Sequence, residues 1–278
     1  MARSFIKWVG GKGRAMPSLL PILTSVEFKD YHEPFLGGGA AFLSLAEMGR
    51  VHGAVLGDIN TKLICAWQQV KECPLAVIRE LLFYEAWDGK HFYLAVRERF
   101  NAREPDSEEW GPGEYAAAFI YLNRAGYNGL YRENLSGEFN VPFCGPPHRK
   151  LGVGICYRDE ILFASHILQD VVLHSMDFEE ALEWVKPGDL VYADSPYHKA
   201  GQSMYTAREF SEDDQRRLAW SLLDVVNRGA HVVASNADTP LIRELYSEFD
   251  QVPSTRLNSV NQDPEDRGPR PDLILVSF

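Results

Sequence analysis

The sequence predicts an α/β fold in which a parallel sheet carries an inserted, mostly helical lobe. Short apolar runs that end in turn or acidic residues are typical of strands in such a sheet, and helix-like patterns lie between them. From about residue 61 to residue 147 the pattern is instead mostly helical. We therefore expect a sheet domain formed by residues 1–60 and 148–278, with residues 61–147 as the inserted lobe.

The order of the elements follows from these patterns. The predicted strands are Tyr31–Phe35, Val51–Leu56, Leu190–Ala193, His231–Ser235 and Leu273–Phe278. Predicted helices of the sheet domain are Ala40–Met48, Asp213–Val226 and Pro240–Phe249. Ser211 is the expected N-cap of the second helix, because Asp214 stands three residues on, as in a capping box. Predicted helices of the lobe are Ile64–Val70, Leu75–Tyr84, His91–Phe100 and Glu114–Asn123. Predicted loops are Glu104–Gly113, Cys144–Gly154 and Asn261–Pro271.

Composition excludes several classes of protein. The 278 residues are 45% hydrophobic and 24% charged, with 22 glycines and 16 prolines, which excludes disorder, collagen and a disulfide scaffold. A formal net charge of −11 argues against coating of nucleic acid by bulk charge, although a local basic cleft is compatible with it. The four cysteines form no C-x-x-C pair, and no apolar run has the length of a signal peptide or a membrane span. We expect free thiols, no metal and a cytoplasmic location.

A glycine run stands between the first predicted strand and the helix after it, in the segment E-P-F-L-G-G-G-A-A-F of residues 33–42. Glycines let a ligand approach the backbone there, and the start of a helix offers free amides. Asp58 follows the next strand about 20 residues on, where an acidic group can accept ribose hydroxyls of a nucleoside cofactor. The run is not G-x-G-x-x-G, so each element alone is better explained as a glycine turn and a solvated aspartate.

The amino-terminal segment K-W-V-G-G-K-G-R, residues 7–14, places an aromatic ring beside cations. It is not a phosphate loop, because Gly13 follows Lys12 where Ser or Thr is needed and Ile6 replaces the leading glycine. The remaining features suit an adenine ring together with a carboxylate or phosphate. Taken alone, the segment is equally well explained as a solvated arm.

The motif D-S-P-Y, residues 194–197, follows the predicted strand Leu190–Ala193, where open α/β sheets place their chemistry. A carboxylate and a backbone carbonyl there can accept both hydrogens of an exocyclic amine. That contact turns the nitrogen lone pair toward an electrophile, while Tyr197 stacks on the ring that bears the amine. Seen alone, a helix-capping Asp194 followed by a buried tyrosine explains the motif equally well.

Arg, Asn and Tyr alternate with turn-forming glycines in Y-L-N-R-A-G-Y-N-G-L-Y-R, residues 121–132, and G-E-F-N-V-P-F follows at residues 137–143. Such side chains read bases and fill gaps in an opened duplex. A folded aromatic turn with incidental arginines is the simpler explanation. It does not explain why Arg124, Asn128 and Arg132 cluster outside any apolar stripe.

In this order, the four segments resemble the Dam-like, D12-class adenine-N6 DNA methyltransferases. In that family a K-W-x-G-G-K loop precedes the cofactor glycines, a target-recognition lobe follows and a D-P-P-Y motif comes last. The resemblance covers nearly the whole chain, and four motifs in one order are far more specific than any one of them. It implies a Rossmann-like sheet that binds S-adenosylmethionine. The implied reaction is methyl transfer to adenine N6 in double-stranded DNA, with the base rotated out of the duplex and GATC as the leading site.

The resemblance also implies the roles of particular residues. The expected catalytic residues are Asp194, Ser195, Pro196 and Tyr197. Those expected to bind the cofactor are Trp8, Lys12, Glu33, Phe35, Gly37, Gly39, Asp58 and Asp194. Those expected to bind DNA are Lys7, Arg124, Tyr127, Asn128, Leu130, Arg132 and Pro142. Tyr127 and Asn128 are expected near the space that the adenine vacates, and Arg132 is expected to read a guanine. The family acts without a metal and usually as a monomer on DNA, in the nucleoid or, if phage-encoded, in the host cytoplasm.

The chain departs from the family pattern at two motifs. Ser195 replaces the first proline of D-P-P-Y, although Pro196 still biases Ser195 toward an extended backbone. After G-E-F-N-V-P-F, the segment C-G-P-P intervenes before Arg149 and Lys150, which become the candidate phosphate contacts.

Two alternative functions remain open at this point. The acid, carbonyl and ring of the D-S-P-Y motif do not distinguish among exocyclic amines, so methylation of cytosine N4 or of RNA is the first. The second is a catalytically silent DNA-binding homologue that lost turnover through the change at Ser195. A nucleotide-dependent oxidoreductase fits less well, because the glycine pattern is wrong and nothing resembles a hydride-transfer site.

Overall fold

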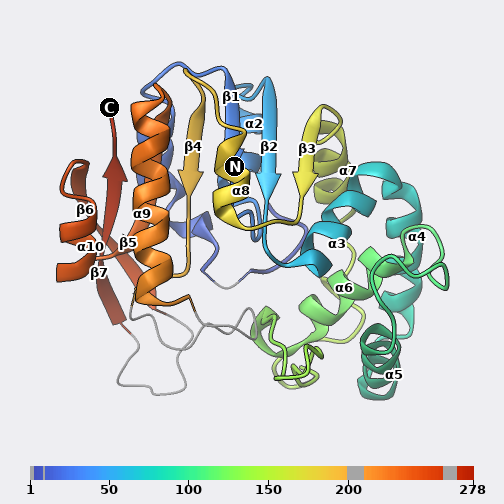
Figure 1. The fold of residues 1–278 in the computed structure, drawn as a ribbon. Coiled ribbons are helices and arrows are strands. Elements are labelled where there is room, and N and C mark those ends of the chain that lie inside the picture. The colour runs from blue at the N-terminus through green and yellow to red at the C-terminus, as the bar shows by residue number, and fades with distance from the viewer. Residues whose placement is uncertain (1–2, 9, 199–209, 259–267) are drawn as a thin grey trace.

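A seven-stranded sheet with the strand order β3-β2-β1-β4-β5-β7-β6 organises the molecule in the computed structural model (Figure 1). The structure describes residues 3–8, 10–198, 210–258 and 268–278. The parallel strands are β1 (Asp30–Glu33), β2 (Gly53–Gly57), β3 (Val171–His174), β4 (Leu190–Ala193) and β5 (His231–Ala237). Strand β7 (Gly268–Val276) runs antiparallel to both β5 and β6 (Asp250–Asn258). The predicted Rossmann-like α/β class is confirmed.

Burial explains which strands the sequence reveals. All four residues of β4 are buried, as expected of a central parallel strand with both faces covered, so β4 appears in the sequence as an apolar run. The two strands that we did not predict lie at the edges of the sheet. Strand β3 exposes Val172, and β6 is polar and contains Pro253, as edge strands tolerate. The prediction of a loop at Asn261–Pro271 is wrong for residues 268–271, which belong to β7, and the remainder lies outside the described residues.

Helices of the sheet domain cover both faces of the sheet. Helices α2 (Ala40–Glu47) and α9 (Glu212–Asn227) lie where predicted, and the capping box of Ser211 and Asp214 is confirmed. Helix α10 (Pro240–Leu245) begins where predicted and ends four residues before the predicted Phe249. Three helices were not predicted: α1 (Met16–Leu23), α7 (Arg158–Ile167) and α8 (Phe178–Glu183). Two prolines in α1 and the shortness of α8, six residues, weaken the helical signal that the sequence carries.

The helical lobe contains α3 (Thr61–Glu72), α4 (Pro74–Ala86), α5 (Lys90–Asn101) and α6 (Glu114–Ala125), close to the predicted ranges. In Figure 1 the parallel strands point down toward the side on which the lobe lies. Helix α6 is buried from Tyr115 through Ala125, so it is the centre of the lobe. Phe42 of α2 and Phe119 of α6 belong to one continuous hydrophobic core. The lobe is therefore packed directly against the elements that carry the site.

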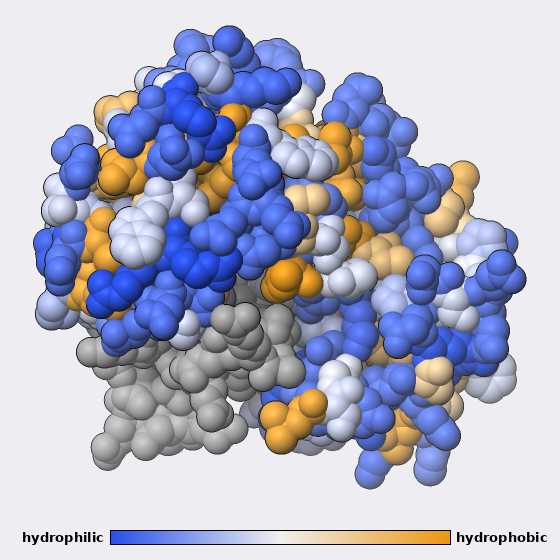
Figure 2. Space-filling model, viewed as in Figure 1, coloured by the Kyte–Doolittle hydropathy of each residue, from blue (hydrophilic) through white to orange (hydrophobic). Residues whose placement is uncertain are grey.

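Among the described residues, no helix is long and apolar enough to cross a bilayer. Hydrophilic side chains cover most of the face seen in Figure 2, and the hydrophobic residues on it form scattered groups.

Candidate active site

Three acidic residues stand at the carboxyl ends of three neighbouring strands. Glu33 ends β1, Asp58 follows β2 and Asp194 follows β4. The strand order reverses between β1 and β4, because the chain builds outward from β1 through β2 to β3 and then returns to β4 on the other side. Open α/β sheets bind their ligands outside the carboxyl ends of the strands at such a reversal. The acids predicted to bind the cofactor and to act in catalysis therefore lie together at the carboxyl ends of the strands.

Lys12 joins the amino-terminal loop to the D-S-P-Y motif. Its ammonium Nζ lies 2.8 Å from Asp194 Oδ1 and donates a hydrogen bond to Tyr197 Oη at 2.6 Å. The Lys12 and Asp194 side chains are only 10% and 18% exposed, so water screens the pair weakly. The sequence predicted a cofactor contact for Lys12, and the structure places this lysine against Asp194 and Tyr197 of the catalytic motif.

Protonation follows from this arrangement. Burial disfavours the Lys12 ammonium, yet Asp194 and Tyr197 together keep the pKa of Lys12 above its ordinary value. Burial, and then Asp194, raise the pKa of Tyr197 to about 12 against the opposing effect of Lys12. At neutral pH the site therefore holds a charged lysine beside a neutral phenol.

The glycine turn is fixed by the Asp58 carboxylate. Gly37 N donates to Asp58 Oδ2 and Asn60 N donates to Asp58 Oδ1, each at 3.0 Å. Gly37 has φ +48°, and a Cβ atom there would lie 2.7 Å from Cδ1 of the Trp8 ring. Gly39, the N-cap of α2, has φ +65°, and a Cβ atom there would meet the Trp67 ring at 2.9 Å. Side chains at both positions are excluded by backbone conformation and by close packing.

Glu33 and Asp58 both have raised pKa values. Glu33 is 2% exposed, and its Oε2 accepts hydrogen bonds from Tyr31 Oη at 2.9 Å and Phe42 N at 3.2 Å. Burial raises its pKa to about 8, Tyr31 opposes this, and Asp194 adds to it. Burial likewise raises the pKa of Asp58 to about 6, against the hydrogen bonds from two backbone amides. Both carboxylates would gain from a neighbouring cation or hydrogen-bond donor.

Trp8 and Phe35 complete the predicted cofactor set. Trp8 stacks on Tyr131 of the lobe at a centroid distance of 5.4 Å and an interplanar angle of 27°. Phe35 follows β1 and packs against Phe178 of α8, with centroids 5.6 Å apart. Both residues precede the glycine turn in sequence, and both rings are already packed against other aromatic rings.

The recognition turn brings Lys7, Tyr127, Asn128 and Pro142 together. Tyr127 is 47% exposed, and its amide donates to the Pro142 carbonyl at 2.9 Å. Asn128 is exposed and has a left-handed backbone with φ +55°. The Lys7 side chain lies against Gly129, where a Cβ atom would meet Lys7 Cδ at 2.4 Å. These four predicted DNA contacts therefore share one surface.

Leu130 and Arg132 lie beside this surface and are half-buried. Arg132 Nε donates to Asn140 Oδ1 at 2.7 Å, so the residue expected to read a guanine is held by the G-E-F-N-V-P-F segment.

The prediction that Arg124 contacts DNA is wrong, because this side chain is buried. It is only 4% exposed and donates from Nε to the Phe5 carbonyl at 2.6 Å and from Nη2 to the Ser4 carbonyl at 3.2 Å. Its guanidinium carbon lies 3.8 Å from the centre of the Tyr157 ring. This arginine holds the amino-terminal segment onto the lobe and does not face solvent.

Arg149 is likewise paired within the protein. Its guanidinium Nη2 lies 2.6 Å from Asp88 Oδ2, and its Nε donates to the Cys144 carbonyl at 2.9 Å. The expected phosphate contact is therefore a residue that holds the Cys144–Gly154 loop, whereas Lys150 is exposed.

Sequence reasoning missed the polar residues that support the motif from behind. Gln215 of α9 and Asn236 of β5 are each 1% exposed. Gln215 contacts the Pro196 backbone within the motif, and Asn236 contacts the backbone of His198, the residue that follows it. A single glutamine within an amphipathic helix carries no signal. Asn236 does carry one, because it stands at the carboxyl end of an apolar strand, the edge at which the other site residues lie.

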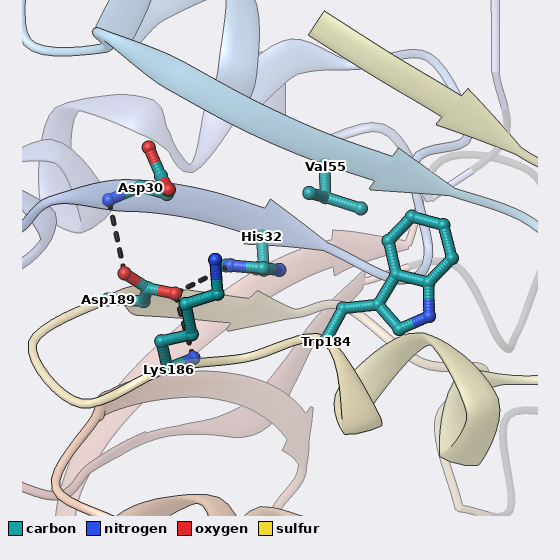
Figure 3. Close-up of a pocket in the computed structure, with 6 residues that line it drawn as sticks. All are labelled: Asp30, His32, Val55, Trp184, Lys186 and Asp189. Carbon is teal, nitrogen blue, oxygen red and sulfur yellow. Dashed lines mark hydrogen bonds and ion pairs between the residues drawn. The ribbon is translucent and has the colours of Figure 1, made fainter.

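A cavity of about 290 Å³ lies away from these motifs (Figure 3). Its lining residues are Asp30, His32, Val55, Trp184, Lys186 and Asp189. Asp30 begins β1 and Asp189 precedes β4, so the cavity lies toward the amino-terminal ends of strands whose opposite ends carry the site. His32 Nε2 lies 2.9 Å from Asp189 Oδ2. Within the described residues, no group of three or more His, Cys, Asp or Glu side chains is placed to hold a metal ion.

Comparison with known proteins gives the family. A family model described as D12 class N6 adenine-specific DNA methyltransferase matches residues 8–260. Among similar proteins, "Type II methyltransferase M1.LlaDCHI" of Lactococcus lactis subsp. cremoris is 32% identical over 99% of this chain and 95% of its own length. "Type II methyltransferase M.MjaIII" of Methanocaldococcus jannaschii is 34% identical over 89% of each chain. A "DNA adenine methylase" of Haemophilus influenzae is 32% identical over 99% of this chain and 93% of its own. The chain belongs to the D12 class of N6 adenine-specific DNA methyltransferases.

Proposed function

We propose that this enzyme transfers a methyl group from S-adenosylmethionine to adenine N6 in double-stranded DNA, with GATC as its site. The observation that supports the proposal most is the contact of Asp194 and Tyr197 with Lys12 at the reversal of the strand order, beside a glycine turn held by Asp58. That arrangement is suited to an amine acceptor beside a binding site for a nucleoside cofactor.

The residues at the glycine turn fit S-adenosylmethionine. Each oxygen of the Asp58 carboxylate accepts one backbone amide and retains acceptor capacity for a ribose hydroxyl. The glycines leave the backbone open to close approach, and the buried Glu33 is suited to the cationic methionine part. When bound, the cofactor supplies an electrophilic methyl group on a sulfonium, so the protein needs to align the amine and needs no metal.

Asp194 and the Ser195 carbonyl would accept the two hydrogens of the adenine amine and turn the N6 lone pair toward the methyl group. The Lys12 ammonium, 2.8 Å from the carboxylate, favours its ionised form, which is the better acceptor. The base must leave the duplex to reach this site, at a cost of a few kcal/mol that stacking on Tyr197 offsets.

The surface formed by Lys7, Tyr127, Asn128 and Pro142 would contact the DNA. An exposed ring and an exposed amide beside a lysine combine stacking, base-edge hydrogen bonding and phosphate contact. We also propose that residues 61–147 form the recognition domain, and that the enzyme acts as a monomer in the cytoplasm.

The test is to incubate the purified protein with S-adenosylmethionine and unmethylated plasmid, then map the product by methylation-sensitive sequencing and nucleoside analysis. N6-methyladenine confined to GATC supports the whole proposal. Methyladenine at other sites overturns GATC alone. N4-methylcytosine, or methylation of RNA only, overturns the substrate. Cofactor and DNA binding without any methyl transfer indicates the silent homologue.

A further inference from the structure

A chain of three hydrogen bonds holds the D-S-P-Y turn from behind. Gln215 Nε2 donates to the Pro196 carbonyl at 2.8 Å. Asn236 Oδ1 accepts the His198 amide at 3.0 Å, and Asn236 Nδ2 donates to Gln215 Oε1 at 2.9 Å. The two side chains are bonded to each other and to the backbone on both sides of Tyr197, so they connect the turn to α9 and β5.

Only one orientation of the two amides satisfies this chain. Asn236 Oδ1 also accepts the Ala237 amide at 2.8 Å, so the oxygen must face the backbone and the NH₂ group must face Gln215. Gln215 must then turn its own NH₂ group toward the Pro196 carbonyl. Both side chains are 1% exposed, so water cannot replace a lost partner.

Ser195 stands where the family motif has its first proline. Proline fixes its own φ near −65°, whereas serine leaves that angle free. We infer that Gln215 and Asn236 are positioning residues that keep Asp194 and the Ser195 carbonyl aimed at the target amine in place of the missing proline. The inference rests on the proposed function of Asp194.

The first test compares Gln215→Met with Gln251→Met. Methionine preserves the length of the side chain and removes its donor. Gln251 is the matched control, since its Nε2 donates to the carbonyls of Arg243 and Tyr246 at 2.9 and 3.0 Å, far from the motif in sequence. At saturating cofactor and DNA we expect the single-turnover rate of Gln215→Met to fall at least tenfold, with both dissociation constants within twofold of wild type. Gln251→Met should stay within twofold of wild type. Equal rates for Gln215→Met and wild type would overturn the inference.

The second test measures the coupling to Ser195. We expect Ser195→Pro to raise the single-turnover rate in both wild type and Gln215→Met. The factor should be at least fivefold larger in Gln215→Met, because proline would restore the constraint that was lost with the glutamine. An identical factor in both backgrounds means that the glutamine does not substitute for the proline, and the inference fails.

A third measurement is independent of methyl transfer. Hydrogen exchange of the His198 amide should be at least tenfold faster in Asn236→Leu than in wild type, and unchanged in Asp194→Ala. If wild type methylates no adenine, the proposed function fails while the exchange experiment still tests how the turn is held. Normal methylation by wild type together with unchanged exchange in Asn236→Leu would overturn the inference alone. Thermal melting identifies variants that do not fold. If Asn236→Leu does not fold, Asn236→Asp replaces it, because aspartate keeps the acceptor for the His198 amide. The single-turnover rate of Asn236→Asp must then be at least tenfold lower than that of wild type.

Discussion

The site at the carboxyl ends of the strands, called here the sheet edge, differs from the recognition turn around Tyr127 and Asn128. The two regions differ in how many of their polar groups already have hydrogen-bond or ion-pair partners within the protein. At the sheet edge, Glu33 is 2% exposed and accepts two hydrogen bonds, and Asp194 is already paired with Lys12. At the recognition turn, Tyr127 is 47% exposed and Asn128 faces solvent. The chemistry is thus assembled in advance within the fold, whereas recognition depends on groups whose partners must come from another molecule.

This comparison predicts that substitutions at the sheet edge change catalysis or cofactor binding most, while substitutions at the turn change DNA recognition with little effect on stability.

Asp194→Ala removes the group that would accept the amine hydrogen. We expect a loss of about 10³-fold or more in single-turnover rate, somewhat above the usual effect of removing one aligned hydrogen-bonding group, because Lys12 also loses its carboxylate. The melting temperature and circular dichroism of the variant should show a folded protein. Near-normal methylation by this variant would contradict the assignment.

Gly37→Ala tests the glycine turn. The φ of +48° and the 2.7 Å approach of the Trp8 ring both oppose a side chain, so the left-handed backbone alone costs about 1–2 kcal/mol and the ring must also move. We expect cofactor affinity to fall more than tenfold in isothermal titration. Gly13→Ala is the matched control, because a Cβ atom there has no neighbour within 4 Å, and its affinity should match wild type. Equal losses in both variants would refute the steric explanation.

Glu33 should make cofactor binding depend on pH. With a pKa of about 8 it is protonated at pH 7, and binding a cation beside it would release that proton, so affinity should rise about tenfold per pH unit up to about pH 8. Glu33→Gln should abolish this dependence.

The raised pKa of Glu33 also affects stability. The folded state holds a proton that the unfolded chain loses near the ordinary value of 4.5, so the free energy of unfolding falls as pH rises from there to about 8. The glutamine variant should therefore melt at a higher temperature than wild type at pH 8.5 without cofactor. A lower melting temperature there would contradict the protonation of Glu33.

Asn128→Gly should weaken recognition without unfolding the turn. Glycine adopts the left-handed backbone of Asn128 readily and removes only the exposed amide. We expect the ratio of methylation rates at the preferred site and at single-base variants of it to fall about fivefold. A change of this size is at the lower end of the range for the loss of one base contact. The melting temperature should barely change. Leu135→Ala, at a side chain that is 96% exposed in the same lobe, should leave discrimination intact, and a similar loss there would mean that the turn has no special role.

Much of this protein could be predicted from the sequence where the signal is local. Central strands such as β4 are apolar runs, and Ser211 and Asp214 form the capping box that their spacing predicts. The edge strands and the short helices were not predicted. Strand β6 is polar and contains a proline, and α8 has only six residues. Their stability comes from neighbours in space more than from their own pattern.

The sequence by itself determined the class of fold, the order of the motifs and the acidic residues at the carboxyl ends of β1, β2 and β4. Only the tertiary structure decided which residues meet. Lys12 and Tyr197 are 185 positions apart and share a hydrogen bond, and Arg124 is buried against Phe5 instead of facing DNA. Gln215 reaches Pro196 because α9 packs behind the motif. Periodicity and spacing encode which face of an element is buried, but contacts between distant residues depend on strand order and packing, which no local pattern specifies.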